Sequence, residues 1–306
     1  MTETVSVSGS RGRGARVAPV RVRAMGRGDI PAGLRLCRAS HWNQIARDWE
    51  LFLAMSPDGC RVAIDDHGAV IGSVATLRYG EALSWVAMVL VDPARRGEGI
   101  GTRLLEEALR LLDGVPTVRL DATPAGHGVY LPLGFCEEYR LQRLERPASA
   151  AVPGEASAGD DGSSPVVRPM TDADLAEVFA LDLAAFGADR SELLRAFQCG
   201  APDYAWVAGR HAIEGFLLGR HGHTFEHLGP LVARDESLAR RLVDACLAAH
   251  AGRPFILDAP PHRAWMEWLA ARQFTAQRPF VRMYRGPRRH EETLGGIFAS
   301  AGAEFS

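Results

Sequence analysis

The segment from Ser84 to Asp113 limits the possible folds of this chain more than any other stretch. Trp85 to Val91 is an uncharged, mainly apolar run, which is typical of a strand covered on both faces. Asp92-Pro93 ends that strand, because proline has no N–H for the sheet and fixes its own φ. Apolar residues at helical spacing between Leu104 and Leu112 then predict an amphipathic helix. The segment therefore predicts a strand, a tight loop and a helix in direct succession.

The loop between strand and helix, Arg95-Arg96-Gly97-Glu98-Gly99-Ile100-Gly101, predicts a binding site for an anion. Alternate glycines leave no Cβ beside the peptide N–H groups, and the positive end of the helix dipole points into the loop. The two arginines add guanidinium groups that match phosphate oxygens. A tight turn with two solvated arginines is the alternative, but the unbroken order of strand, proline, arginines, glycines and helix favours a diphosphate site. It is not a Walker loop, since the chain contains no lysine.

At these residues the chain resembles the GNAT superfamily of acyltransferases, whose pattern Arg/Gln-x-x-Gly-x-Gly/Ala is matched by Arg96, Gly99 and Gly101. The resemblance implies that loop N–H groups hold the pyrophosphate of acetyl-CoA. It also implies that the preceding strand splays from its neighbour and binds the pantetheine arm through free backbone groups. The residues expected on this basis to bind the cofactor are Val89, Leu90, Val91, Arg95, Arg96, Gly97, Glu98, Gly99, Ile100, Gly101 and Thr102.

A pattern of elements found in the first half of the chain recurs in the second. From Val20 to Leu144 we expect one strand, two helices, three strands, helix, strand, helix and strand, with the last strand, Phe135 to Leu144, closing the sheet. Arg23-Ala-Met25 with Asp29 recurs as Arg168-Pro-Met170 with Asp174, and Leu120-Asp121-Ala122 recurs as Leu257-Asp258-Ala259. At the place of the glycine loop the second copy has Val232 to Ala239, without glycines and with two carboxylates. The alternative is an unrelated α/β domain with chance matches.

Together with this resemblance, the recurring pattern predicts an α/β fold (α+β, mixed sheet) with two acyl-CoA N-acyltransferase-like (GNAT) domains in tandem, the second degenerate. The expected parts are a disordered tail (1–18), a GNAT domain that binds acetyl-CoA (19–147), a linker of small and polar residues (148–164), a degenerate GNAT-like domain (165–286) and a C-terminal tail (287–306). In the tail, Leu294, Ile297 and Phe298 are enough to dock onto the body but not to fold alone.

The composition favours a small-molecule partner. A net charge of −2 offers no basic field for nucleic acid or anionic lipid. The five cysteines are odd in number and scattered, which predicts a reducing cytoplasm and neither disulfides nor a metal site. No apolar stretch approaches the length of a membrane span, so we expect a cytoplasmic protein, monomeric or homodimeric, without membrane contact.

Tyr130 is the candidate general acid. A departing thiolate of pKa about 8.5 can be protonated by a phenol of pKa about 10. Tyr130, in Tyr-Leu-Pro-Leu-Gly134-Phe135, stands where the resemblance implies that acid, and a hydrogen-bonded tyrosine packed between helix and sheet is the alternative. Candidates for the base are Asp121 at a strand end, Glu81 before the central strand and His41 in a helix break. For Asp121 the alternative is a structural role in the following turn.

The resemblance also places the acceptor site, at the break between the first two helices. The resemblance implies that this segment, which includes Trp42, Asn43 and Gln44, borders the acceptor. An indole face suits a cationic amine, although Trp42 could equally anchor the helix pair in the core. We therefore expect transfer of an acetyl group from acetyl-CoA to a primary amine of a small molecule, by direct attack in a ternary complex. A non-catalytic acyl-CoA-binding or regulatory protein and a protein-amine acetyltransferase are the alternatives.

Overall fold

The computed structural model describes residues 20–150, 165–287 and 294–306. In the first half the elements are β1 (Arg21–Ala24), α1 (Ile30–Ala39), α2 (Ala46–Met55), β2 (Arg61–Ile64), β3 (Val70–Tyr79), β4 (Leu83–Val91), α3 (Ile100–Leu111), β5 (Thr117–Ala122), α4 (Pro124–Tyr130) and β6 (Cys136–Arg146). In the second half they are β7 (Val166–Pro169), α5 (Leu175–Phe186), α6 (Ser191–Gly200), β8 (Trp206–Gly209), β9 (Ile213–Arg220), β10 (Glu226–Ala233), α7 (Glu236–Ala249), β11 (Phe255–Ala259), α8 (Arg263–Ala271), β12 (Thr275–Arg285) and β13 (Ile297–Ala299). The predicted order is confirmed in both halves. The predicted N-terminal tail and most of the predicted linker lie outside the described residues.

The repeat is also visible in local structure. Asp29 binds the guanidinium of Arg23 at 2.7 Å and accepts a hydrogen bond from the Gly26 N–H just before α1. Asp174 does the same with Arg168 at 2.6 Å, before α5. In both halves the carboxylate fixes the passage from the first strand into the first helix, which is why this pattern was recognisable in the sequence.

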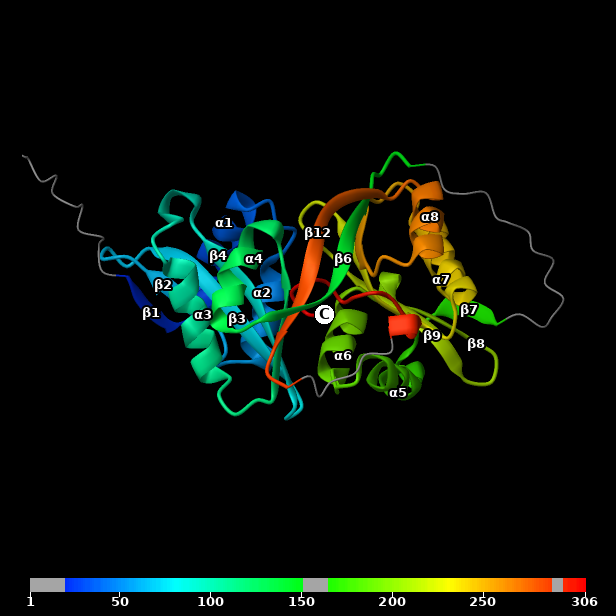
Figure 1. The fold of residues 1–306 in the computed structure, drawn as a ribbon. Helices are drawn as coiled ribbons and strands as arrows, with labels where there is room; N and C mark the ends of the chain where they lie inside the picture. The colour runs from blue at the N-terminus through cyan, green and yellow to red at the C-terminus, as the bar shows by residue number, and fades with distance from the viewer. Residues whose placement is uncertain (1–19, 151–164, 288–293) are drawn as a thin grey trace, which may run out of the picture.

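The two halves exchange their last long strands. All strands of the described residues form one mixed sheet in the order β1-β2-β3-β4-β5-β12-β6-β11-β10-β9-β8-β7, with β13 beside β10. The prediction that Phe135 to Leu144 closes the first sheet is therefore wrong, since β12 lies between β5 and β6, and β6 pairs with β11. Strand periodicity shows which residues form a strand but not which edge that strand joins. Figure 1 shows β12 and β6 together at the centre, between the halves.

Two buried ion pairs connect the exchanged strands. Arg282 of β12 binds Asp121 of β5 through two N–H groups at 2.8 and 2.9 Å, and Arg143 of β6 binds Asp258 of β11 at 2.7 and 2.6 Å. Burial raises the pKa of the Asp258 carboxyl, but the charge and hydrogen bonds of Arg143 outweigh burial and hold that pKa at about 2. Each strand-end aspartate thus neutralises an arginine from the other half.

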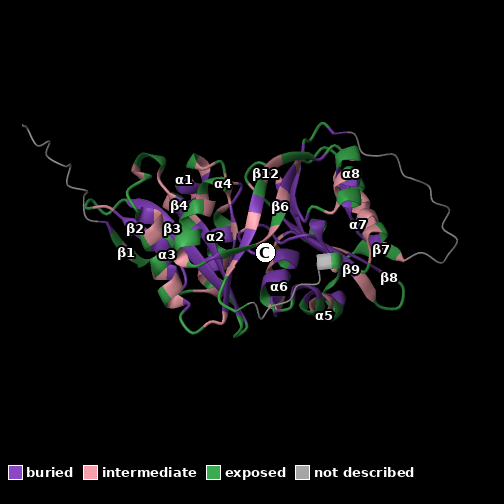
Figure 2. Ribbon diagram, viewed as in Figure 1, coloured by how far each residue is buried: buried purple, intermediate pink, exposed green. Residues whose placement is uncertain are grey.

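The C-terminal residues lie inside the molecule. In Figure 1 the C-terminus is at the centre, and Figure 2 shows buried residues converging there. Phe305 stacks on Phe52 of α2 with ring centroids 4.7 Å apart and meets Phe197 of α6 edge-on at 5.4 Å. The carbonyl groups of Ala303 and Phe305 accept hydrogen bonds from the Trp85 indole and the Tyr79 hydroxyl. The predicted docking of the tail is confirmed, and the tail joins the two halves in one core.

Candidate active site

The glycine loop leads into α3 without any side-chain cap. Gly97 and Gly99 adopt φ of +83° and +76°, the left-handed region that favours glycine, and a Cβ at either position would meet nothing within 4 Å. Among the described residues, no acceptor is provided for the backbone N–H groups of residues 97–99. The loop is exposed and lies at the positive end of the α3 dipole, so it can bind an anion.

The two loop arginines are not free cations, because each has partners within the protein. Arg95 binds Glu98 at 2.8 Å, while Arg96 extends toward the Val91 carbonyl and the Ser40 hydroxyl at 3.4 and 3.3 Å. Both are near the surface, where such pairs contribute little stability and can be exchanged for a phosphate. The anion site therefore depends mainly on the backbone N–H groups.

β4 and β5 separate next to this loop. They pair only from Leu83 to Trp85, opposite Thr117 to Arg119. Beyond that point two residues of β4, Met88 and Val89, stand opposite one residue of β3, and Met88 has φ of +54°. This bulge bends β4 away from β5. A cavity opens in the gap, and its lining includes Val86, Ala87, Met88, Val89, Asp121, Thr123 and Tyr130.

Tyr130 reaches this gap from the end of α4. It is 8% exposed and meets Phe135 edge-on, with ring centroids 6.0 Å apart. Burial raises the pKa of its phenol to about 12. Tyr130 is therefore protonated at neutral pH, which is the state a proton donor needs.

The three candidate bases lie in different places. Asp121 lines the gap, but its carboxylate is ion-paired with Arg282. It therefore joins β5 to β12, which is a structural role. Glu81 is exposed in the turn before β4, at the opposite end of that strand from the glycine loop. His41 is exposed, has φ of +56° and lines a second cavity. The structure thus brings Asp121, but neither Glu81 nor His41, together with Tyr130.

The predicted acceptor segment lies at the boundary between the halves. Trp42 is partly buried and lines both the gap and the second cavity. The Asn43 side chain binds the loop between β9 and β10, accepting from the Thr224 and Phe225 N–H groups at 2.9 and 3.0 Å and donating to the Phe225 carbonyl. Gln44 lines the gap and donates to Glu304 at 2.9 Å. Asn43 therefore binds the second half and also lines the second cavity, Trp42 lines both cavities, and Gln44 lines the gap.

Glu304 is a residue of this site that the sequence did not reveal. It lines the gap together with Met88 and Tyr130, and is 4% exposed. Its Oε1 binds Arg220 and Gln44, whereas its Oε2 has Arg143 at 4.0 Å. Burial raises the pKa of the Glu304 carboxyl, but the charges of Arg220 and Arg143 outweigh burial and hold it below its usual value. Nothing in the tail sequence except its apolar docking residues pointed to this position.

In the second half, the protein itself occupies the two places that correspond to the cofactor site: the N-terminus of α7 and the gap between β10 and β11. The Asp235 side chain caps α7 by accepting a hydrogen bond from the Leu238 N–H at 2.9 Å. A carboxylate of the protein thus occupies the helix N-terminus, where an anionic ligand would otherwise bind. β10 and β11 pair only at Glu226 and His227, and β13 lies in the gap beyond, paired with Leu231 and Val232. Ser300 next to it donates to the Asp258 carbonyl of β11 at 2.9 Å.

Gly229 shows how closely the tail fits this second gap. β10 has a bulge at Gly229 and Pro230, as β4 has at Met88 and Val89. Gly229 has φ of +142°, and a Cβ there would lie 1.9 Å from the Ser300 carbonyl oxygen. Only glycine allows the tail to approach so closely. The gap that is open in the first half is thus filled by protein in the second.

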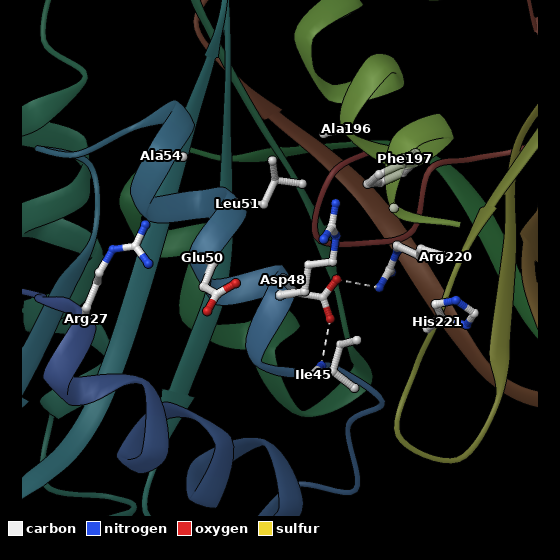
Figure 3. Close-up of a pocket in the computed structure, with 12 residues that line it drawn as sticks. Arg27, Ile45, Asp48, Glu50, Leu51, Ala54, Ala196, Phe197, Arg220 and His221 are labelled. Atoms are coloured by element: carbon white, nitrogen blue, oxygen red, sulfur yellow. Dashed lines mark hydrogen bonds and ion pairs between the residues drawn. The ribbon is translucent and has the colours of Figure 1, made fainter. Parts of the chain in front are cut away.

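A further cavity, of about 250 Å³, lies between α2 and α6. Figure 3 shows Asp48 there, between the Ile45 N–H and Arg220. Burial raises the pKa of the Asp48 carboxyl to about 6, against the opposing charge of Arg220. Since Arg220 binds both Asp48 and Glu304, it separates this cavity from the gap that contains Tyr130. The cavity therefore reaches neither the glycine loop nor Tyr130.

Comparison with known proteins decides the family. Models of the acetyltransferase (GNAT) domain match residues 56–137 and residues 178–299. The chain is a tandem GNAT protein. A holothin acyltransferase from Pseudoalteromonas sp. (strain SANK 73390) is 26% identical over 81% of this chain and 82% of that protein. The GNAT domains and this relative identify the chain as an acyltransferase.

Solved structures share the fold over both halves. A crystal structure from Pyrococcus horikoshii, 21% identical, has a TM-score of 0.77 and covers 98% of this chain and 99% of that chain. A tandem GNAT protein from the clavulanic acid biosynthesis pathway has a TM-score of 0.63 at 18% identity, covering 87% of this chain and 98% of that chain. The mixed sheet with two GNAT domains in tandem is therefore confirmed. Among the described residues, no helix has the length and apolar character of a membrane span.

Proposed function

We propose that this tandem GNAT protein transfers the acetyl group of acetyl-CoA to a primary amine of a small molecule, by direct attack in a ternary complex. The observation that carries the proposal is the placement of two features at the same end of β4: the free N–H groups of residues 97–99, in the loop that follows β4, and the cavity beside the β4 bulge, whose lining includes Tyr130. Acetyl-CoA supplies the thioester that the amine attacks. The loop residues hold its pyrophosphate, and Val89 to Val91 border its pantetheine arm.

Each protein group then has a defined part. Tyr130, protonated at neutral pH, donates its proton to the thiolate as the carbon–sulfur bond breaks. Glu304 Oε2 lies on the wall of the same gap and accepts a hydrogen bond from the incoming amine. An alkyl amine of pKa about 10.4 must lose a proton before attack. Because Asp121 is held by Arg282, the ammonium releases that proton to solvent before attack rather than to this carboxylate. The second proton, which the nitrogen loses after attack, returns to the Tyr130 phenolate through solvent, so that the protons balance.

The position of the site between the two halves favours a small acceptor over a protein. Residues of both halves border the gap, and residues of both halves also border the second cavity, which has a volume of about 410 Å³. A protein substrate would need an open groove that accepts an extended chain. The position of Tyr130 beside the gap supports catalysis over passive acyl-CoA binding.

The proposal is tested by measuring release of free thiol from acetyl-CoA over a panel of primary amines, with mass spectrometry of the products. Acceptor-dependent thiol release with formation of the N-acetyl product is expected. Binding of acetyl-CoA without consumption of any amine would instead indicate a non-catalytic acyl-CoA-binding protein. Acetylation confined to protein lysines or N-termini would indicate a protein acetyltransferase.

Glu304→Gln should weaken binding of the amine without weakening binding of acetyl-CoA. The amide keeps the shape of the side chain but removes the charge that faces an ammonium, so KM for the amine should rise by about tenfold or more. Steady-state kinetics with each substrate varied in turn measures this. Glu226→Gln is the matched control, because Glu226 is also a buried carboxylate paired with His221 and Arg253, but lines none of these cavities. An unchanged KM for the amine in Glu304→Gln would contradict the assignment.

A further inference from the structure

The second cavity continues from the acceptor end of the gap. It lies where the break after α1 meets the loop between β9 and β10 and the first residues of β12. Trp42, Arg143 and Arg278 line both this cavity and the gap. This cavity therefore offers space for the remaining atoms of an acceptor whose amine lies in the gap.

The charges around the cavity do not balance. Arg143 is neutralised by Asp258, but the Arg38 guanidinium donates to the backbone carbonyls of Trp42 and Gln44. Arg278 donates to the His41 carbonyl at 3.1 Å and to the Gln277 side-chain oxygen at 3.3 Å. Within the described parts of the chain, no carboxylate lies within 4 Å of Arg38 or Arg278. In this part of the chain, Arg38 and Arg278 thus border the cavity without a carboxylate in direct contact.

Arg278 is the one placed to bind a ligand. It is partly buried, and burial together with the charge of Arg143 lowers its pKa, against the more distant opposing charges of Asp258, Glu145 and Glu304. A half-buried guanidinium beside a second guanidinium is unfavourable until an anion joins it. Arg38, by contrast, uses its N–H groups to hold the loop that carries Trp42. A carboxylate or phosphate next to Arg278 would make strong charge-assisted hydrogen bonds and give this guanidinium a direct ionic partner.

We propose that the acceptor amine also carries an anionic group, a carboxylate or a phosphate, which Arg278 binds in the cavity between the two halves. This rests on the proposed acetyl transfer and narrows its substrate class to amino acids and aminoalkyl phosphates. The arrangement gives the acceptor a direction: the anionic end lies at Arg278, and the amine lies at Glu304 beside the thioester.

The test compares matched acceptors on the purified full chain. The pairs are an amino acid and its amide, and phosphoethanolamine and ethanolamine, each assayed over a range of pH so that amine protonation is matched. The wild type should use the anionic member of at least one pair with about tenfold or greater kcat/KM. A preference confined to the first pair identifies a carboxylate, and one confined to the second pair identifies a phosphate; either supports the proposal.

Arg278→Gln should remove that preference through KM for the anionic acceptor, leaving kcat and KM for acetyl-CoA within about twofold. Arg278→Lys should keep part of the preference for the anionic acceptor, since an ammonium group retains the positive charge but not the two-pronged hydrogen bonding of the guanidinium. Arg285→Gln, on the same strand but exposed and lining none of these cavities, is the control. If Arg278 only held the His41 loop, the variant would lose kcat equally for charged and neutral acceptors, which would overturn the proposal.

The outcomes separate the two proposals. Equal use of both members of each pair, unaffected by Arg278→Gln, refutes the anion site while leaving acetyl transfer intact. If no amine in any panel is acetylated, the proposed function fails, and this inference fails with it.

Discussion

Gly99→Glu should abolish binding of acetyl-CoA. The new carboxylate would sit at the N-terminus of α3, where it can take the N–H groups that a diphosphate needs, as Asp235 does at α7. Like charges would also repel the diphosphate. We expect Kd to rise by about 100-fold or more, equivalent to about 2.7 kcal/mol. Isothermal titration calorimetry with acetyl-CoA measures this, and the wild type should bind one molecule per chain because Asp235 and β13 occupy the second site.

Gly114→Glu provides a matched control. Gly114 also has a left-handed φ, of +80°, and a Cβ there would meet nothing within 4 Å. The control therefore introduces the same charge and the same backbone strain, which costs about 1–2 kcal/mol, but after the other end of α3. It should bind acetyl-CoA like the wild type. Full affinity in Gly99→Glu, or loss of affinity in both variants, would show that the loop is not the diphosphate site.

The elements of this fold could be predicted from the sequence because they depend on local patterns. The run from Trp85 to Val91, the proline that follows and the leucines of α3 specify a strand, a stop and a helix without help from distant residues. The exchange of β6 and β12 could not be predicted, since both strands have the same alternation and either could pair with β5. Arg143 and Arg282 select the partners, but their aspartates lie 115 and 161 residues away.

The candidate site, too, has a part that could be predicted from local sequence and a part that could not. The glycine loop and Tyr130 lie within one short stretch, so their spacing showed them together. Glu304 joins them only because β13 enters the gap between β10 and β11 and carries the chain end to the centre of the molecule. The role of Asn43 was also hidden, because its partners in the loop between β9 and β10 are 181 and 182 residues away. Contacts over such separations are set by the fold, not by local pattern.

Tyr130→Phe should lower kcat while leaving acetyl-CoA binding nearly unchanged. The phenyl ring keeps the packing against Phe135 but has no proton for the thiolate. Loss of a general acid typically costs about 100-fold or more in rate, so kcat should fall by about that factor. The wild type should also lose no activity to ionisation of Tyr130 below about pH 10, because burial raises the pKa of its phenol to about 12.

Kinetics and calorimetry on the same preparations distinguish this role from a structural one. Tyr284→Phe is the control, since Tyr284 is a partly buried tyrosine of β12 that lines neither the gap nor the second cavity. If Tyr130→Phe kept the wild-type kcat, the proton would have to reach the thiolate from solvent, and the site would need no acid. If instead acetyl-CoA affinity and the melting temperature fell with kcat, Tyr130 would act by packing between α4 and the sheet. A fall in kcat alone is the result that assigns the proton to its hydroxyl.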